Sequence, residues 1–255
     1  MKRTENEWNM KRTVGRTEIW LSVMLVMALM PVTLKGQDLS ITSTAGGWTY
    51  ASGLHTIIND GAYTIEMTTP STTTTTDRIV VAGGVTADIT LNGVSIDRSA
   101  DVSNSPTACA FNIVSNFPVN LTLLGNNTLK SGNALPGLYA ASSKILTITA
   151  ASTGALSAFG GNNAAGIGGD MGGTPGNITI NGGTINATGG SGGAGIGGGL
   201  SGAGGTTVIN GGTVTAIGGT GAAGIDGGAG GSGINSMTHP TAATVTAPNT
   251  ACPQR

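Results

Sequence analysis

The stretch Asn177-Ile-Thr-Ile-Asn-Gly-Gly-Thr-Ile-Asn-Ala-Thr-Gly-Gly190 returns in the next part of the chain as Thr206-Thr-Val-Ile-Asn-Gly-Gly-Thr-Val-Thr-Ala-Ile-Gly-Gly219. A Gly-Ile-Gly-Gly at residue 166 recurs at 195, and Gly-Ile-Asp-Gly follows at 224, so the same interval separates all three. Looser copies of the pattern begin upstream at Asp88, Asn120 and Lys144. Self-similarity at a fixed period, here about 29 residues, is typical of solenoid proteins, in which each repeat stacks on its neighbours.

The repeats place aliphatic residues in three columns. The first column is Ile96, Leu129, Leu156, Ile185 and Val214; the second is Phe111, Leu138, Ile167, Ile196 and Ile225; the third is Ile89/Leu91, Leu121/Leu123, Leu146/Ile148, Ile178/Ile180 and Val208. Period-two alternation of β-branched residues indicates short strands. Coils stacked about 4.8 Å apart would turn each column into a buried stripe. The sequence therefore predicts an all-β, single-stranded right-handed parallel β-helix of about 29 residues per coil.

Glycine and asparagine fit the corners of such a coil. Of the 45 glycines, 32 lie between Gly160 and Gly233, where we expect many corners to need a positive φ. Asn181 and Asn210 occupy equivalent positions at one corner of successive repeats. Stacked strands favour amide ladders, so we expect these two side chains to pair.

The composition excludes several classes of protein. The 255 residues carry a formal net charge of -1, and charged residues make up 9% against about 25% in a typical domain. With 11 Lys and Arg, the chain lacks the basic surface of a nucleic-acid binder. The glycines do not recur at every third position, which excludes collagen.

Four segments follow from these patterns. Residues 1–36 combine a basic start with an apolar run broken by Pro31, which is typical of a signal peptide, so we expect a secreted or cell-surface protein with no membrane span in the mature chain. Residues 37–86 are predicted to form an N-terminal β cap and a first irregular coil, and residues 87–233 the repeats. Residues 234–255 form an irregular tail, which either covers the last coil loosely or belongs to a fragment of a longer protein.

Cysteine usage gives a weak signal. Cys109 and Cys252 would meet an oxidising compartment, where a long-range bridge is an option. Two cysteines so far apart, one of them in a Pro-rich tail, favour unpaired thiols instead.

The coils "ITINGGTINATGGSGGAGIGGG" and the preceding "DITLNGVSID", "NLTLLGNNTLKSG" and "LTITAASTGALSAFGG" resemble secreted bacterial β-helix proteins of the Bacteroidetes and Firmicutes type. Such proteins are described as carbohydrate-binding and are similar to non-catalytic relatives of pectate-lyase-like solenoids. The resemblance spans about residues 38–233. It implies export and the fold, and it carries no catalytic residue onto this chain.

The sequence offers few charged residues for catalysis or metal binding, and one short stretch contains a cluster of them. Asp97, Arg98 and Asp101 form a cluster, and between Ile145 and Gly233 the charged residues are Asp170 and Asp226, at unequal repeat positions. Polysaccharide hydrolases need two convergent carboxyls, and lyases a base with acids that hold Ca²⁺. A solvated loop with an ion pair explains the cluster better than a Ca²⁺ site. We therefore expect no catalytic site, no metal site and no cofactor.

Sugar recognition needs less: aromatic rings for stacking and polar groups for hydroxyls. Trp48, Tyr50 and Tyr139 are candidates for such a platform, with Asp97, Arg98 and Asp101 as polar candidates, although packing in the cap explains the rings as well. The leading hypothesis is an exported, non-catalytic module that binds a polysaccharide or a cell-surface glycan. Two alternatives stay open: a lyase-like enzyme with Arg98 as base, and a purely structural extracellular repeat protein.

Overall fold

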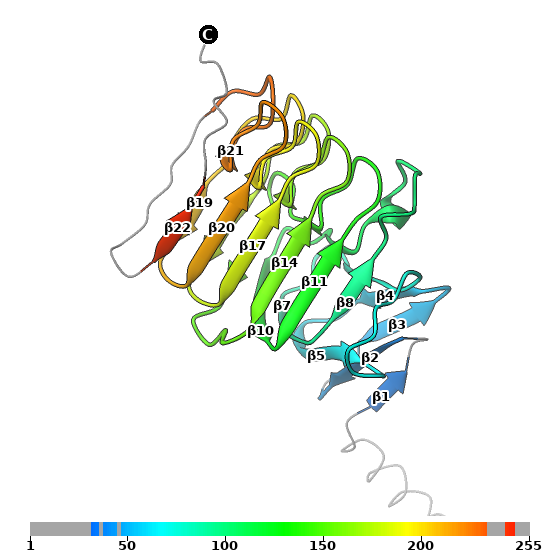
Figure 1. Cartoon of the computed structure of the whole chain (residues 1–255). Helices are drawn as coiled ribbons and strands as arrows, with labels where there is room; N and C mark the ends of the chain where they lie inside the picture. Colours follow the sequence, from blue (N-terminus) through cyan, green and yellow to red (C-terminus); the bar gives the residue numbers. More distant parts are fainter. Residues whose placement is uncertain (1–31, 36–37, 45–46, 234–242, 248–255) are drawn as a thin grey trace, which may run out of the picture.

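Three β-sheets wind around one core in the computed structural model, which describes residues 32–35, 38–44, 47–233 and 243–247. The chain makes about six turns of about 29 residues each. Figure 1 shows the strands of one sheet side by side along the solenoid axis. Within the described residues the helical content is one 3-10 turn, η1 (Pro106–Ala108). The prediction of an all-β parallel solenoid is confirmed.

Each coil contributes one strand to each sheet. Sheet A contains β1 (Val32–Lys35), β2 (Leu39–Ser43), β5 (Gly61–Met67), β7 (Ala87–Asn92), β10 (Pro118–Leu124), β13 (Ile145–Ile148), β16 (Asn177–Ile180) and β19 (Thr207–Ile209). Sheet B contains β3 (Trp48–Ala51), β4 (Leu54–Ile57), β6 (Arg78–Val81), β9 (Phe111–Ile113), β12 (Leu138–Tyr139), β15 (Ile167–Gly168), β18 (Ile196–Gly197) and β21 (Ile225–Asp226). Sheet C contains β8 (Ser95–Asp97), β11 (Asn126–Lys130), β14 (Ala155–Phe159), β17 (Thr184–Thr188), β20 (Thr213–Ile217) and β22 (Thr244–Thr246).

Alternation along each strand decides which side chains form the core. In β13, Leu146 and Ile148 are fully buried, while Ile145 and Thr147 face outward. The same alternation repeats in the strands above and below, so that inward residues stack from coil to coil. The predicted column through Phe111, Leu138, Ile167, Ile196 and Ile225 is confirmed by the strand register.

Two of the predicted columns are wrong by two residues at one step each, whereas the steps Ile96–Leu129, Leu156–Ile185 and Ile185–Val214 of the first column are confirmed. Leu129 lies beside Ile96 and Ala158, whereas Leu156 lies beside Asn127 and Ile185. A shift of two keeps every side chain on the same face of a strand, so the alternation cannot reveal it.

The third column has the same error in sheet A. Leu146 pairs with Val119, and Ile148 with Leu121. Val208 faces outward, and its neighbours Thr207 and Ile209 occupy the core positions instead. The chain length between equivalent strands varies in this part of the solenoid, which a fixed period does not capture.

The N-terminal part departs from the parallel pattern. β2 pairs antiparallel with β1 and β5, and β3 pairs antiparallel with β4. Trp48 lies at the end of the inner column formed by Ile57, Val81 and Ile113, and its side chain is buried there. The first coil is therefore irregular, and an aromatic ring covers the end of the core. Of the predicted signal peptide, 1–36, only Val32–Lys35 falls within the described residues.

At the other end, part of the tail adds to a sheet. β22 pairs in parallel with β20, and the partly buried Ala243, Val245 and Ala247 pack against the core. Residues 234–242 and 248–255 of the predicted tail lie outside the described residues. No helix among the described residues has the length and apolar character needed to cross a bilayer.

Glycines serve the winding in two ways. At Gly183 the backbone has a φ of +77°, as predicted for a corner. At Gly190 no positive φ is involved; a Cβ there would overlap the carbonyl oxygen of Gly161 in the preceding coil. Close approach of coils, which the sequence did not reveal, therefore accounts for part of the glycine content. The expected amide ladder is present, since Asn210 Nδ2 donates to Asn181 Oδ1 at 2.8 Å.

Candidate functional site

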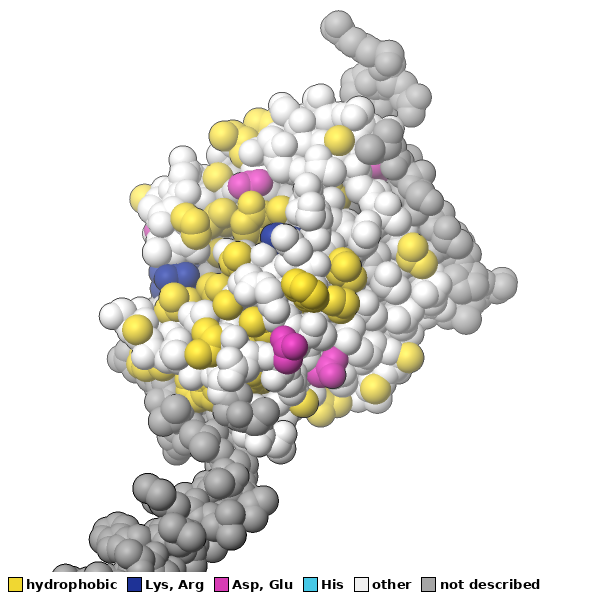
Figure 2. Space-filling model, turned by 180° about the vertical axis from the view of Figure 1, so that it is seen from behind, with side chains coloured by type: hydrophobic (Ala, Val, Ile, Leu, Met, Phe, Trp, Pro, Cys, Tyr) yellow, Lys and Arg dark blue, Asp and Glu magenta, His cyan; other side chains and the backbone are white. Residues whose placement is uncertain are grey.

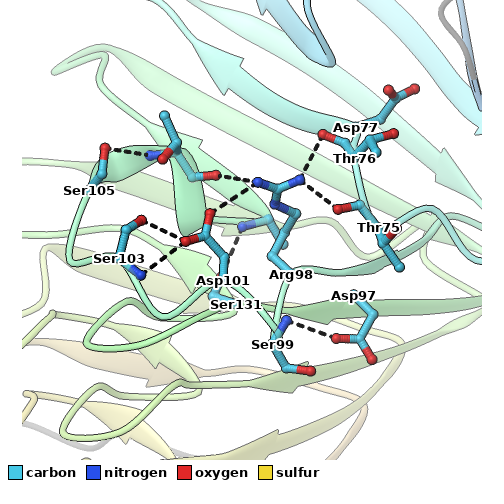
Figure 3. A network of polar contacts seen from close by, with 12 residues as sticks. Thr75, Thr76, Asp77, Asp97, Arg98, Ser99, Asp101, Ser103, Ser105 and Ser131 are labelled. Carbon is cyan, nitrogen blue, oxygen red and sulfur yellow. Dashed lines mark hydrogen bonds and ion pairs between the residues drawn. The ribbon is translucent and has the colours of Figure 1, made fainter.

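The charge cluster singled out from the sequence is built around the guanidinium of Arg98 (Figure 3). Arg98 Nη1 donates to the carbonyl oxygens of Thr75 and Thr76 at 2.6 and 2.9 Å. Arg98 Nη2 donates to Asp101 Oδ2 and to the carbonyl oxygen of Thr107, both at 3.2 Å. The side chain is only 14% exposed. Arg98 therefore links the loop that contains Thr75 and Thr76 to the loop that contains Asp101 and Thr107, and its two terminal nitrogens donate to protein acceptors.

Asp97 and Asp101 have separate partners and do not converge. Burial alone would raise the pKa of Asp97, but hydrogen bonds from Ser99 and the Lys130 ammonium at 3.3 Å lower it below its usual value. Hydrogen bonds from Ser103, aided by Arg98, lower the pKa of Asp101. Both carboxylates are thus held ionised by their own neighbours. No group of three or more His, Cys, Asp or Glu that could hold a metal ion occurs in the part of the chain that the structure describes.

The three candidate aromatic rings do not form one platform. Trp48 is 6% exposed and Tyr50 is 38% exposed, and both rings lie against His55, at centroid distances of 5.6 and 4.7 Å. Tyr139 is half-buried on β12 and packs against Cys109 and its neighbours. Burial first, and then the adjacent Asp170, raise the pKa of Tyr139. Tyr50 is therefore the candidate ring with the most exposed surface.

Cys109 is a buried thiol rather than a reactive one. It is 1% exposed, and its Sγ lies 3.3 Å from the carbonyl oxygen of Phe111. Burial raises the pKa of the thiol to about 12, against a usual value of 9.0. Cys252, the other half of the bridge considered from the sequence, lies outside the described residues.

A buried histidine–carboxylate pair was missed in the sequence. His55 Nε2 lies 3.1 Å from Asp77 Oδ2, and neither side chain is exposed. The same oxygen accepts the backbone N–H groups of Asp38 and Leu39 at 3.0 and 3.1 Å. Burial lowers the pKa of His55, although Asp77 acts in the opposite direction. The only sequence signal was the position of His55 two coils before Phe111 in the second column.

Beside the Arg98 cluster, the loop 68–77 forms one wall of a polar groove of about 440 Å³, here called the corner groove. Thr73 Oγ1 lies 2.8 Å from Ser95 Oγ, and Thr74 bridges in parallel to Ile96, so the loop is fixed along β8. Hydroxyl, amide and carboxylate groups predominate among its lining residues, which are Glu66, Met67, Pro70, Ser71, Thr72, Thr73, Asn92, Gly93, Ser95, Asn126 and Thr128.

A second hollow of about 230 Å³, here called the face hollow, lies on the outward side of sheet A. It is lined by Thr42, Ser43, Thr44, Ala62, Tyr63, Thr64, Asp88, Thr90 and Thr122. Asn120 Nδ2 donates to Asp88 Oδ1 at 2.7 Å at its border. Tyr63 is buried and donates to the carbonyl oxygen of Asn59 at 2.7 Å, so its ring belongs to the wall and is not a free stacking surface.

Both hollows lie in the N-terminal half, between residues 42 and 128. None of the six candidate residues lines either hollow; Arg98 contacts the wall of the corner groove through the carbonyl oxygens of Thr75 and Thr76 in the loop 68–77. From the side opposite to Figure 1, the surface carries few Lys, Arg, Asp and Glu side chains among polar and apolar atoms (Figure 2). Hydroxyl and amide recognition of a polar ligand is the chemistry that these hollows offer.

Comparison of the chain with protein-family models, curated proteins and solved structures finds no match.

Proposed function

We propose that this chain is a non-catalytic β-solenoid that binds a polysaccharide in the corner groove. The observation that carries the proposal is the groove itself, about 440 Å³ and lined by five hydroxyl side chains, two amides and one carboxylate. Such groups match the alternating donors and acceptors of a sugar, since each hydroxyl and amide can both donate and accept.

The groove favours binding over cleavage. Glycoside hydrolysis uses two carboxyls about 5–10 Å apart, whereas Glu66 is the single titratable side chain among the lining residues. The lyase alternative needs a base, and Arg98 donates to three backbone carbonyls and to Asp101 instead. These contacts leave Arg98 a structural role, which is to hold the loop 68–77 in place as the groove wall.

A blocking substitution tests the site against a matched control. Thr128 and Thr215 occupy the same outward row of sheet C, three coils apart, but only Thr128 lines the groove. We expect Thr128→Trp to abolish retention on the polysaccharides that wild type binds in a pull-down panel, and Thr215→Trp to leave retention unchanged. No retention of wild type on any polysaccharide, or equal retention of Thr128→Trp, would overturn the proposal. Release of unsaturated oligosaccharides would favour the lyase alternative.

The glycine-rich half suits a structural role in the same protein. Between Ile145 and Gly233 its charged residues are Asp170 and Asp226, and its outward rows on sheet C are mostly Thr, Asn and Ser. We propose that this half is a spacer that carries the groove at its N-terminal end.

We also propose that the protein is exported through residues 1–36. Cleavage after Gly36 would remove β1 and leave β2 as the edge strand of sheet A. N-terminal sequencing of the exported protein tests this: a start at Gln37 is expected, and an intact residue 1 in the extracellular fraction would contradict it.

A further inference from the structure

The corner groove and the face hollow lie in line along the same two strands. On the outward side of β5 the order is Ala62, Thr64 and then Glu66, with the first two lining the face hollow and the third the corner groove. On β7, Asp88 and Thr90 line the face hollow, and Asn92 lines the corner groove. Four residues along a strand span about 13 Å. The two hollows therefore form one polar track parallel to the strands, long enough for a linear oligomer.

The charged side chains that line this track are both acidic. Glu66 and Asp88 are the only charged side chains among the residues that line the two hollows. Each interacts with an amide rather than a cation: Asn92 Nδ2 donates to Glu66 Oε2 at 3.4 Å, and Asn120 Nδ2 to Asp88 Oδ1 at 2.7 Å. Both side chains are exposed. Their charges are thus not compensated by an ion pair within the described residues.

Three basic side chains of the described residues are engaged with other partners. Arg98 pairs with Asp101, and Lys130 with Asp97. Lys144 Nζ donates to the carbonyl oxygen of Val114 and to Asn116 Oδ1, both at 2.7 Å. The two carboxylates of the track are therefore available to a cation that the ligand itself supplies.

We infer that the track selects an amino-sugar polymer, with its ammonium groups at Glu66 and Asp88 and its hydroxyls on the Thr, Ser and Asn side chains between them. This inference rests on the proposed function and specifies its ligand class. A charge-assisted hydrogen bond is about twice as strong as a neutral one, so a protonated amine gains more at each carboxylate than a hydroxyl does. A polyuronate would place its own carboxylates against Glu66 and Asp88, and like charges repel.

The test compares three soluble oligomers by calorimetry at low salt: glucosamine, N-acetylglucosamine and galacturonate. We expect the order of affinity to follow that sequence. Glu66→Gln and Asp88→Asn are each expected to weaken glucosamine binding about ten-fold, because a charged hydrogen-bond acceptor becomes neutral. Binding of the neutral oligomer should change less. Added salt should reduce the preference, since exposed charges are screened.

Asp170→Asn is the matched control, because it removes one carboxylate far along the chain from the track. It should leave binding at the wild-type level, and unchanged melting temperatures would show that all three variants fold. Wild type that prefers the neutral or the uronate oligomer, or variants that bind glucosamine oligomers as wild type does, would overturn the inference while the proposed function stands. Binding to none of the three, nor to any polysaccharide of the pull-down panel, would overturn both.

Discussion

The close stacking of coils at Gly190 gives the sharpest stability prediction. Gly132, Gly161, Gly190 and Gly219 follow one another at equal intervals of one coil, and in three successive steps a Cβ would overlap the carbonyl oxygen of the preceding glycine. The atoms that a Cβ at Gly190 would meet belong to the backbone of Gly161 and Asn162, so no side-chain rotation can relieve the overlap. For Gly190→Ala the coils must separate locally, which strains the flanking ladder of hydrogen bonds.

Insertion of one methyl group into such a contact costs about 1–3 kcal/mol. For a domain of this size, that loss lowers the melting temperature by about 2–12 °C. Circular dichroism at the β-sheet band, followed during heating and in urea, measures the loss.

Gly83→Ala is the matched control for this prediction. A Cβ at Gly83 meets nothing within 4 Å, and Gly83 does not have a positive φ. The control should melt at the wild-type temperature or slightly above it, because alanine restricts the unfolded chain by about 0.4–1 kcal/mol. Equal melting temperatures of Gly190→Ala and Gly83→Ala would mean that successive coils leave room for a methyl group at Gly190, contrary to this prediction.

Three further predictions concern the core, the histidine pair and the groove wall. Ile209→Ala should cost about 2–5 kcal/mol in urea unfolding, whereas Val208→Ala, which faces outward, should change stability by no more than about 0.5 kcal/mol; the reverse order would contradict the register. The folded-state pKa of His55 is lowered from 6.5, so the unfolded chain binds the extra proton and the melting temperature should fall as the pH drops below about 6.5. His55→Gln should make the melting temperature less dependent on pH. An equal pH dependence in wild type and in His55→Gln would contradict the assignment of this effect to His55. Arg98→Ala should lower the free energy of unfolding by about 2–3 kcal/mol and weaken polysaccharide retention, whereas Lys130→Ala, which removes a solvent-accessible ion pair with Asp97, should lower it by less than about 1 kcal/mol. Intact retention by Arg98→Ala would show that the loop 68–77 does not need Arg98 to form the groove wall.

The fold could be predicted from the sequence because the repeat period is constant in the second half of the chain. Ile167, Ile196 and Ile225 are equally spaced along the chain and do form one column. Upstream, the segment from Leu121 to Ile148 is shorter than the segment from Ile148 to Ile180, although all three residues stack. Loops of variable length leave the inward–outward alternation intact, so only the spatial register reveals which residues are level.

The candidate site could be predicted only in part. Arg98 was identified because charges are rare in this chain, but its partners are the carbonyl groups of Thr75, Thr76 and Thr107, which a sequence does not display as a motif. The corner groove was not predicted, because its threonines, serines and asparagines are the same residue types that cover every face of the solenoid. Its shape depends on the loop 68–77, whose path is set by tertiary contacts.

His55 and Asp77 were missed for a related reason. They are well separated in sequence, and only the winding of one coil brings them to 3.1 Å inside the core. The available signal was the position of His55, which continues the column of Phe111 toward the N-terminus. The predicted column began only at Phe111.

Backbone amide chemical shifts, followed during titration with a glucosamine oligomer, would locate the ligand on the solenoid without any substitution. We expect perturbations along the track, at residues 42–44, 62–73, 88–95 and 122–128, with the coils from 155 to 233 unaffected. Saturable perturbations confined to those glycine-rich coils, or no saturable perturbation with any oligosaccharide tested, would contradict this expectation.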